Sequence, residues 1–283
     1  MKHKLSRRGF FAASTALAAP ARSLLAANKK LILGLELYSV RNELAKDLPG
    51  TLQAVAKMGY EAVEFFGPYA DWKLEYAKEV RKILDDVNLK AMSAHTGAKY
   101  FTPDELSRVI ELNQAIGSSS IIMSSGGGVK TLDGWKEVAG KLTAADAKLM
   151  PLKMRTGFHN HQTEFMPLEG KRPIEILAAN TPKRVVLQLD VGTCLQAGSD
   201  PIAWVKANPG RIASMHLKDW KNAPGHEGYR ILFGEGYTKW KELIQTAQKT
   251  GGLEYVLVEQ EGHALPPFEA AEKCLNNLKK VLA

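Results

Sequence analysis

Three polar residues in the second half of the chain lie where apolar runs end. Asp190, His216 and Glu259 each follow such a run, so each is expected at the end of a buried strand. A buried carboxylate or imidazole needs a partner, because burial removes its hydrogen bonds to water. One divalent cation would satisfy all three side chains at once. Imidazole and carboxylate ligands suit Mn, Co, Fe, Mg or Zn better than a metal that prefers thiolates.

Histidines gather at comparable positions. Six histidines follow the first 27 residues, and four of them lie near the ends of expected strands: His95, His159, His161 and His216. Side chains from separate strands converge on one axis if the strands close into a barrel. His95 is expected to bind substrate, although a histidine at a strand end is often only part of a structural hydrogen-bond network.

Three further charged residues accompany the histidines. Glu64 stands in an apolar run and is expected either to contact substrate or to pair with a basic neighbour. Glu164 comes shortly after a His-Asn-His run and is expected to contact substrate. Lys218 could neutralise negative charge that develops on a substrate oxygen. The alternative for Lys218 is a salt bridge with Asp219.

Eight apolar or β-branched runs, each followed by a helical pattern, predict the elements that position these residues. The runs are Leu31–Leu37, Ala62–Phe66, Leu89–Ser93, Ser120–Met123, Gly157–His161, Val185–Asp190, Ala213–Lys218 and Tyr255–Glu259. Strands that alternate with helices indicate a parallel sheet, and eight units favour a closed (β/α)8 TIM barrel of the α/β class. No Gly-x-Gly-x-x-Gly follows the first run, so a dinucleotide-binding fold has no support.

The helices carry start and stop signals of their own. Asp47 and Gly59 bound the first helix. The sequence Thr102-Pro103-Asp104-Glu105 predicts a capping box with proline at the first helical position. No linker or change in composition divides the chain, so residues 28–283 are expected to form a single domain.

The first 27 residues have the pattern of an export signal. They contain five basic residues and no acid, and Arg7-Arg8 precedes Phe10-Phe11 and a short apolar stretch. Paired arginines in this setting are typical of the twin-arginine pathway, which predicts a periplasmic protein; the alternative is a basic tail without a role. The apolar stretch is shorter than the roughly 20 residues that span a bilayer, so stable membrane insertion is not expected.

Charge and cysteine content exclude other classes. The net charge of +8 falls to +3 when the five basic residues of the signal are set aside. No basic stripe with interleaved aromatic residues remains, so nucleic acid is not an expected partner. Cys194 and Cys274 are expected to be buried thiols rather than a disulfide. The oligomeric state stays open, and an oligomer is compatible with the sequence.

Six motifs occur in a characteristic order along the chain. They are Leu37-Tyr38-Ser39-Val40-Arg41, Gly59-Tyr60-Glu61-Ala62-Val63-Glu64, Gly157-Phe158-His159-Asn160-His161, Leu189-Asp190-Val191-Gly192, His216-Leu217-Lys218-Asp219 and Val258-Glu259-Gln260-Glu261. In this order and spacing the chain resembles the xylose isomerase-like TIM barrel superfamily, the sugar phosphate isomerase/epimerase group. The resemblance covers nearly the whole chain after the signal.

The resemblance implies a set of metal ligands. The family's usual ligands are Glu, Asp, His and Glu on strands five to eight, and the last three fall on Asp190, His216 and Glu259. The first glutamate aligns with His159, which is therefore expected to be the fourth ligand. His161, two residues later, is expected to be a ligand, a substrate contact or the catalytic base.

The resemblance also implies a chemistry: isomerisation of a non-phosphorylated sugar or keto-sugar through a metal-stabilised enediolate. Glu259, His161 and Lys218 would be the catalytic residues, and the substrate a small carbohydrate. Family epimerases use paired glutamates on strands five and eight, and the histidine on strand five breaks that pair. Thr193 is a second departure, at a position where many relatives have a substrate-binding histidine.

Two alternatives to the isomerase remain. One is a lyase or hydratase that acts on a 3-keto-glycoside by elimination, and the other is a non-catalytic periplasmic sugar-binding protein. Nuclease activity would require a denser set of metal ligands and a basic face, which the sequence does not suggest.

Overall fold

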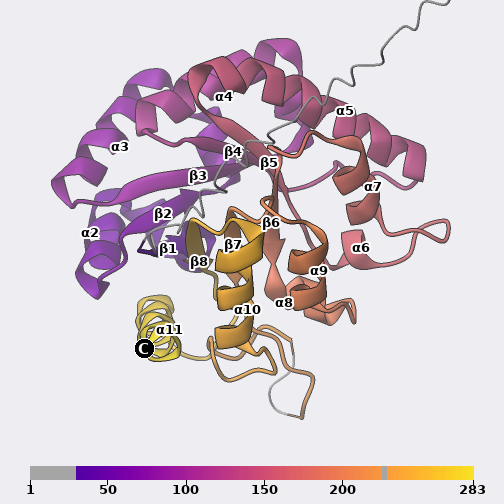
Figure 1. Ribbon diagram of the computed structural model, residues 1–283. Helices are drawn as coiled ribbons and strands as arrows, with labels where there is room; N and C mark the ends of the chain where they lie inside the picture. Colours follow the sequence, from indigo (N-terminus) through magenta and orange to yellow (C-terminus); the bar gives the residue numbers. More distant parts are fainter. Residues whose placement is uncertain (1–29, 225–227) are drawn as a thin grey trace, which may run out of the picture. The chain divides into compact units, whose positions relative to one another are not determined.

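Eight parallel strands close into a barrel in the computed structural model, which describes residues 30–224 and 228–283 (Figure 1). The strands are β1 (Ile32–Glu36), β2 (Ala62–Phe65), β3 (Lys90–Thr96), β4 (Ser120–Met123), β5 (Arg155–His159), β6 (Val186–Asp190), β7 (Ser214–Leu217) and β8 (Tyr255–Val258). Each strand pairs with the next, and β8 pairs with β1, so the predicted (β/α)8 TIM barrel is confirmed. The predicted export signal, residues 1–27, lies outside the described residues.

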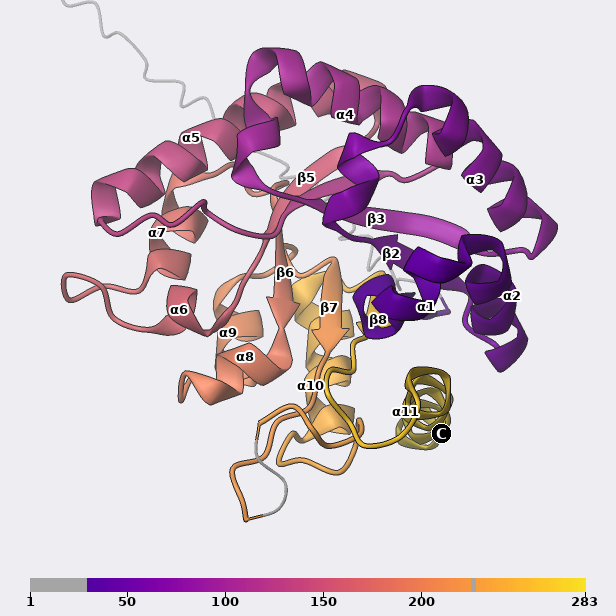
Figure 2. The same cartoon turned by 180° about the vertical axis from the view of Figure 1, so that it is seen from behind.

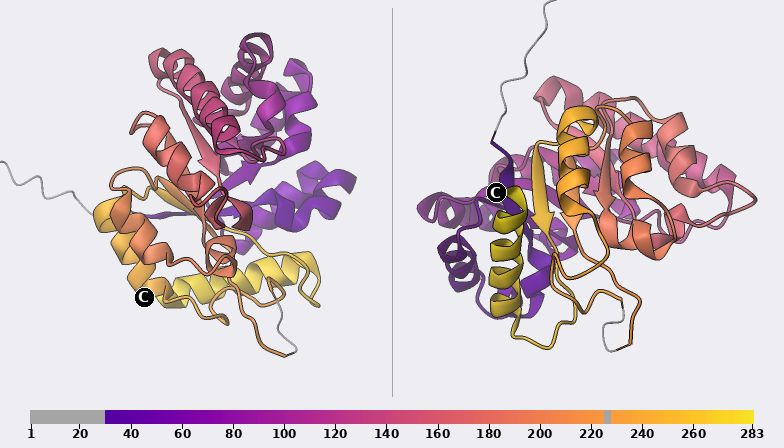
Figure 3. Two further views of the ribbon diagram at one scale, coloured as in Figure 1. Left: turned by 90° about the vertical axis from the view of Figure 1, so that its right-hand side faces the viewer. Right: turned by 60° about the horizontal axis from the view of Figure 1, so that its bottom comes forward.

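Helices surround the strands on the outside of the barrel, as the views from both sides show (Figures 1 and 2). The α-helices are α1 (Arg41–Lys46), α2 (Leu48–Met58), α3 (Leu74–Asp86), α4 (Pro103–Ile116), α5 (Leu132–Leu149), α6 (Gln162–Phe165), α7 (Pro173–Asn180), α8 (Val191–Gln196), α9 (Pro201–Ala207), α10 (Trp240–Thr246) and α11 (Pro267–Leu282). Short turns of 3-10 or π-helix are η1 (Leu37–Val40), η2 (Gly67–Asp71), η3 (Ala98–Phe101), η4 (Met150–Leu152) and η5 (Ala247–Gly251). The C-terminal helix α11 packs beside α2 and α10 and completes the outer layer (Figure 3).

Six strands end at other residues than the sequence predicted, four of them by one residue and two by more. β3 continues to Thr96 instead of ending at Ser93, which places His95 inside the strand. β5 ends at His159 instead of His161. The backbone N–H of His161 donates to Glu164 Oε2 at 2.6 Å, so the chain turns into α6 instead of continuing the sheet.

The predicted helix ends are confirmed at α2, whereas the predicted capping box is wrong. Asp47 accepts the N–H of Gly50 at 2.9 Å, and Gly59 ends the helix with φ of 100°, a conformation that glycine adopts without strain. Helix α4 begins at Pro103 as expected, but the Thr102 side chain makes no capping hydrogen bond. Pro103, as the first helical residue, has no N–H and so removes one of the donors that the first turn would leave unpaired.

Side chains alternate between the outer core and the barrel interior. On β4, Ile121 and Met123 pack in the main core beneath the helices, whereas Ile122 joins a small separate cluster with Val186 and Ala213. Gly157 on β5 packs closely against β6. A Cβ at this position would lie 2.6 Å from a β6 carbonyl oxygen, so a larger residue does not fit without a shift of its neighbours. This small apolar cluster fills only part of the interior, and polar side chains fill the rest.

Two further expectations concern the described residues. Cys194 and Cys274 are both free and buried, as predicted. Within residues 30–224 and 228–283, no helix has the length and apolar character needed to cross a membrane.

Candidate metal centre

A cavity of about 450 Å³ opens at the mouth where the strands end. Its lining is formed by Glu36, Tyr38, Phe66, Gly67, His95, Ser124, His159, His161, Gln162, Thr193, Lys218, Tyr229, Glu259 and Glu261. Polar ligand-type groups and aromatic rings therefore share one site, and carboxylates and imidazoles make up much of its wall.

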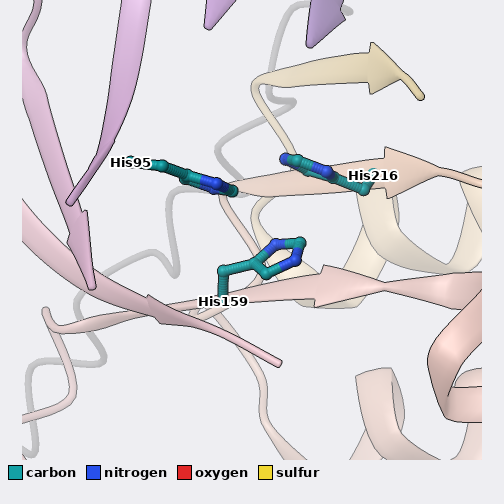
Figure 4. A group of neighbouring side chains, drawn as sticks. All are labelled: His95, His159 and His216. Atoms are coloured by element: carbon teal, nitrogen blue, oxygen red, sulfur yellow. The ribbon is translucent and has the colours of Figure 1, made fainter. Parts of the chain in front are cut away.

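The four predicted metal ligands come together beneath this cavity. One ligand atom from each of His159, Asp190, His216 and Glu259 lies within 4.8 Å of all the others, and all four residues are buried. Figure 4 shows two of these histidines with His95, their three rings gathered from β3, β5 and β7. The rings of His95 and His216 stack with centroids 5.1 Å apart.

Asp190 has the surroundings of a metal ligand. It ends β6, and its Oδ1 accepts the N–H of Thr193 at 2.8 Å at the start of α8. Its Oδ2 is buried and forms no hydrogen bond with any described residue, although Lys218 Nζ lies 3.2 Å away. The Lys218 ammonium offsets part of the cost of burying this oxygen, and a divalent cation held by this donor set would offset the rest.

His159 has a fixed orientation that suits a ligand. Its Nδ1 donates to Gln188 Oε1 at 3.1 Å, which leaves Nε2 with its lone pair, 3.9 Å from Asp190 Oδ2. Burial, together with the positive charges of His216 and other neighbours, holds the pKa of His159 well below its usual range. A neutral, oriented imidazole is the form that binds metal ions.

His216 lies between two carboxylates. Its Nδ1 donates to Glu259 Oε2 and its Nε2 to Glu64 Oε1, each at 2.6 Å. Burial lowers the pKa of His216, but Glu64 and Glu259 outweigh it and raise the pKa to about 10. Burial raises the pKa of Glu259, but the charge of Lys218 and the bond from His216 hold it well below its usual range. Without a bound metal, the imidazolium is therefore the counter-charge of both carboxylates.

Lys218 places a second positive charge at the same site. Its Nζ lies 2.7 Å from Glu261 Oε1, 2.9 Å from Glu259 Oε1 and 3.2 Å from Asp190 Oδ2. Burial lowers its pKa, but these three carboxylates raise the pKa well above its ordinary value. The salt bridge between Lys218 and Asp219 that the sequence offered as an alternative does not form, because Asp219 accepts hydrogen bonds from the segment that follows it.

Asp219 organises the chain between β7 and α10. Its two carboxylate oxygens accept from the backbone N–H groups of Trp220, Gly234 and Gly236 and from the side chains of Thr238 and Trp240, at 2.8–3.0 Å. A carboxylate with several donors is strongly held. The residue that follows Lys218 thus fixes the segment that carries Tyr229 to the edge of the cavity.

The other residues predicted for substrate binding lie in different places. His95 lines the cavity, and its Nε2 lies 2.6 Å from Gln188 Oε1 and 2.9 Å from Glu64 Oε1. Glu64 is fully buried below the cavity. Glu164 does not line it: its carboxylate accepts from the N–H of His161 and from the hydroxyl of Thr163, and so caps α6.

His161 and Thr193 both reach the cavity. His161 is exposed at the rim, with its ring centroid 5.0 Å from that of His159. Thr193 Oγ1 accepts from Asn160 Nδ2 at 3.0 Å, which ties the start of α8 to the end of β5. Thr193, which departs from the family pattern, is thus part of the cavity wall.

Sequence reasoning missed Glu36 and Gln188. Glu36 lies at the end of β1, buried, and burial together with the charge of Glu64 raises its pKa well above its usual value. Gln188 accepts from both His95 and His159 and donates to Glu64 at 2.8 Å. The sequence did contain a signal for both residues, because each one interrupts an apolar strand pattern in the same way as Glu64. With Glu36 included, the set of ligand-type groups is denser than the sequence suggested.

The fold and the site define a TIM barrel with a candidate metal centre at its C-terminal mouth. The chain belongs to the xylose isomerase-like TIM barrel family, which matches residues 52–281. No curated protein matches the sequence.

Solved structures share this fold. A sugar phosphate isomerase/epimerase from Parabacteroides distasonis is 24% identical, covers 92% of this chain and 98% of its own, and superposes with a TM-score of 0.76. A D-psicose 3-epimerase, crystallised in the presence of D-fructose, is 13% identical with a TM-score of 0.69 over 89% of this chain and 99% of its own. A probable 3-DHS dehydratase from Bacillus anthracis is 16% identical with a TM-score of 0.67 over 88% and 99%. At these identities the likeness concerns the fold alone.

Proposed function

We propose that this protein is a divalent-metal-dependent isomerase of a non-phosphorylated sugar or keto-sugar, exported to the periplasm through the twin-arginine pathway. The observation that carries the proposal is the convergence of His159, Asp190, His216 and Glu259 below an open cavity, with a buried Asp190 oxygen that lacks a hydrogen bond. Two solved structures that share this fold are described as a sugar phosphate isomerase/epimerase and a D-psicose 3-epimerase.

The charges in the cavity disfavour a phosphorylated substrate. Among the described lining residues, Lys218 is the one with a permanent positive charge, and carboxylates already surround it. Glu36, Glu259 and Glu261 also line the cavity and would repel a phosphate. The rings of Tyr38 and Phe66 offer apolar surface, which suits the C–H faces of an uncharged sugar.

Three residues of the chain would take part in the reaction: Glu259 as the base, Lys218 as a positive charge and His161 as a proton donor at the rim of the cavity. A bound cation would polarise the substrate carbonyl and acidify the neighbouring C–H. Glu259, kept ionised by Lys218 and His216, would take the proton from that carbon. The Lys218 ammonium would face the oxygen on which negative charge develops. The hydroxyl proton on that carbon would pass to the former carbonyl oxygen, and Glu259 would return its proton to the former carbonyl carbon, which gives an aldose–ketose interconversion. If His161 donated the proton to carbon instead, Glu259 would release its own proton to solvent and His161 would take one up.

Exchange of substrate hydrogen with solvent tests the proposal. Purified, metal-loaded protein is incubated in D₂O with a panel of aldoses, ketoses and keto-sugars, and deuterium at the carbon next to the carbonyl is followed by NMR. We expect exchange and interconversion, both abolished in Asp190→Asn and retained in Glu75→Gln, a change at an exposed residue far from the site. Sugar binding without exchange would contradict the proposal and indicate the non-catalytic sugar-binding protein.

A second cavity favours one alternative, the elimination of a 3-keto-glycoside. This cavity, of about 530 Å³, shares His161 with the first and presents apolar side chains, among them Val129, Trp135 and Met166. A glycoside could place its sugar over the metal centre and its leaving group here, with His161 between them to protonate the departing oxygen. Product analysis with 3-keto-glycosides separates the two: a released leaving group indicates the lyase, and an unbroken glycoside with a moved carbonyl indicates the isomerase.

A further inference from the structure

The face of the barrel opposite the cavity carries a group of exposed lysines. All eight parallel strands begin at this face, and the helices that precede them end there. The described lysines that form ion pairs lie elsewhere: Lys78, Lys136, Lys218 and Lys273. Six exposed lysines lie at strand starts or helix ends of this face: Lys90, Lys153, Lys183, Lys249, Lys279 and Lys280.

Most acidic residues of this face are already paired with arginines. The ion pairs are Arg81–Asp85, Arg184–Asp146 and Arg155–Glu254, with nitrogen–oxygen distances of 2.5–2.8 Å. Glu61 accepts the N–H of Leu33, and Asp86 is exposed. The six lysines outnumber these two remaining carboxylates, so the face has a net positive charge.

An apolar turn protrudes from the same face. Met150, Pro151 and Leu152 are consecutive exposed residues that follow α5, and Met150 and Leu152 are 54% and 43% exposed. Lys153 comes next, and its N–H donates to the carbonyl oxygen of Met150 at 3.1 Å, which closes the turn. A run of exposed apolar residues is unfavourable in water and indicates a function or a partner.

Lys183 lies on the loop beside this turn. Its neighbour Arg184 donates to the carbonyl oxygen of Met154 at 2.8 Å and pairs with Asp146 at the end of α5. These two contacts hold the loop before β6 against the turn before β5. The exposed apolar residues and the charges of Lys153 and Lys183 therefore occupy one part of the face.

We propose that this face docks reversibly on a membrane surface that contains anionic phospholipid. Charge complementarity argues for this partner, because clustered lysines attract anionic headgroups. Met150 and Leu152 would enter the boundary between headgroups and acyl chains without spanning the bilayer. A nucleic acid would use the lysines but would leave the apolar turn in water. Docking by this face leaves the cavity, at the other end of the barrel, open to solvent, and it is independent of the proposed isomerase activity.

Binding to vesicles tests the inference. The chain from residue 28 onward contains every strand and helix of the closed barrel, and it is sedimented with vesicles of phosphatidylcholine alone or mixed with phosphatidylglycerol. We expect binding to the mixed vesicles only, weakened by salt, which screens exposed charges. Lys153→Gln combined with Lys183→Gln should lower the partition coefficient about 25-fold, on the order of fivefold for each lysine. The matched control, Lys78→Gln with Lys136→Gln, removes two exposed lysines near the starts of α3 and α5 and should bind like the wild type.

A second pair of changes tests the apolar turn. Met150→Ser combined with Leu152→Ser should also weaken binding to the mixed vesicles, and unchanged binding would overturn the proposed contact. Equal binding to both kinds of vesicle, or an equal loss in the control pair, overturns the inference as well. Binding to a DNA duplex without binding to vesicles would identify the face as a nucleic-acid surface instead. If circular dichroism shows that the serine pair does not fold, the lysine pair and its control still decide. Vesicle binding without hydrogen exchange would reject the proposed isomerase and leave this inference intact.

Discussion

Replacing Lys218 with methionine removes the ammonium that three carboxylates share but keeps most of the side chain's length. The nitrogen lies 2.7–3.2 Å from oxygens of Asp190, Glu259 and Glu261, and the side chain is 5% exposed. Removing one partner of a buried ion pair costs about 3–5 kcal/mol, because the remaining charge is left uncompensated. We expect the metal-free variant to lose that much unfolding free energy, on the order of 10 °C in melting temperature.

A bound cation changes this expectation. The cation and the ammonium neutralise the same carboxylates, so metal-loaded Lys218→Met should lose much less stability, and its affinity for Mn²⁺ should rise at least tenfold. Urea denaturation of both proteins, with chelator and with saturating Mn²⁺, measures the first effect, and calorimetric titration the second. Lys206→Met, a change at an exposed lysine of α9, is the control and should stay within about 0.5 kcal/mol of the wild type. A loss below about 1 kcal/mol in the metal-free variant would falsify the reasoning, because it would show that the ammonium is not buried among these carboxylates.

Three other predictions follow from the site and the barrel. In the metal-free protein the pKa of His216 is about 10, against 6.5 when the chain is unfolded. The stability that this shift contributes is complete below pH 6.5 and is lost as the pH rises toward 10. Urea midpoints measured across this range should therefore fall in the wild type and fall less in His216→Asn. Gln188→Leu removes the oxygen that orients His159, so calorimetry should show Mn²⁺ binding weakened about 10- to 100-fold, and unchanged affinity would contradict the assigned role. Gly157→Ala places a Cβ 2.6 Å from a β6 carbonyl oxygen and should cost about 1–3 kcal/mol of stability. Gly140→Ala in α5, where the new Cβ meets no atom within 4 Å, should stabilise the protein by roughly 0.5–1 kcal/mol. Thermal unfolding that ranks the two variants in the opposite order would contradict the close packing at Gly157.

The barrel could be predicted because its signals are local and repeated. Each buried strand is a short apolar run, and caps such as Asp47 and Gly59 mark helix ends within a few residues. The convergence of Asp190, His216 and Glu259 follows from the same pattern, because parallel strands of a closed barrel bring their ends to one mouth. The sequence therefore placed these three side chains at one mouth once the strands were found.

The remaining features depend on contacts between strands that no local pattern encodes. Glu36 lies between two leucines and acquires its significance only where β1 meets β2, opposite Glu64. Gln188 alternates with apolar residues, and its contacts with three different strands appear only after the barrel closes. The end of β5 was misplaced because Glu164 captures the N–H of His161 at 2.6 Å, a competition that the alternation of side chains does not reveal.

Asp219 has a consequence for how this barrel can vary. Because five donors of the segment after β7 converge on one carboxylate, the path of that segment is set at a single point directly beside Lys218. Exposed described residues of the segment that do not bond to Asp219, such as Asn222 and Arg230, can be exchanged while the ammonium keeps its place. Libraries that randomise those positions and leave Asp219 intact are thus a direct route to altered substrate range in this scaffold.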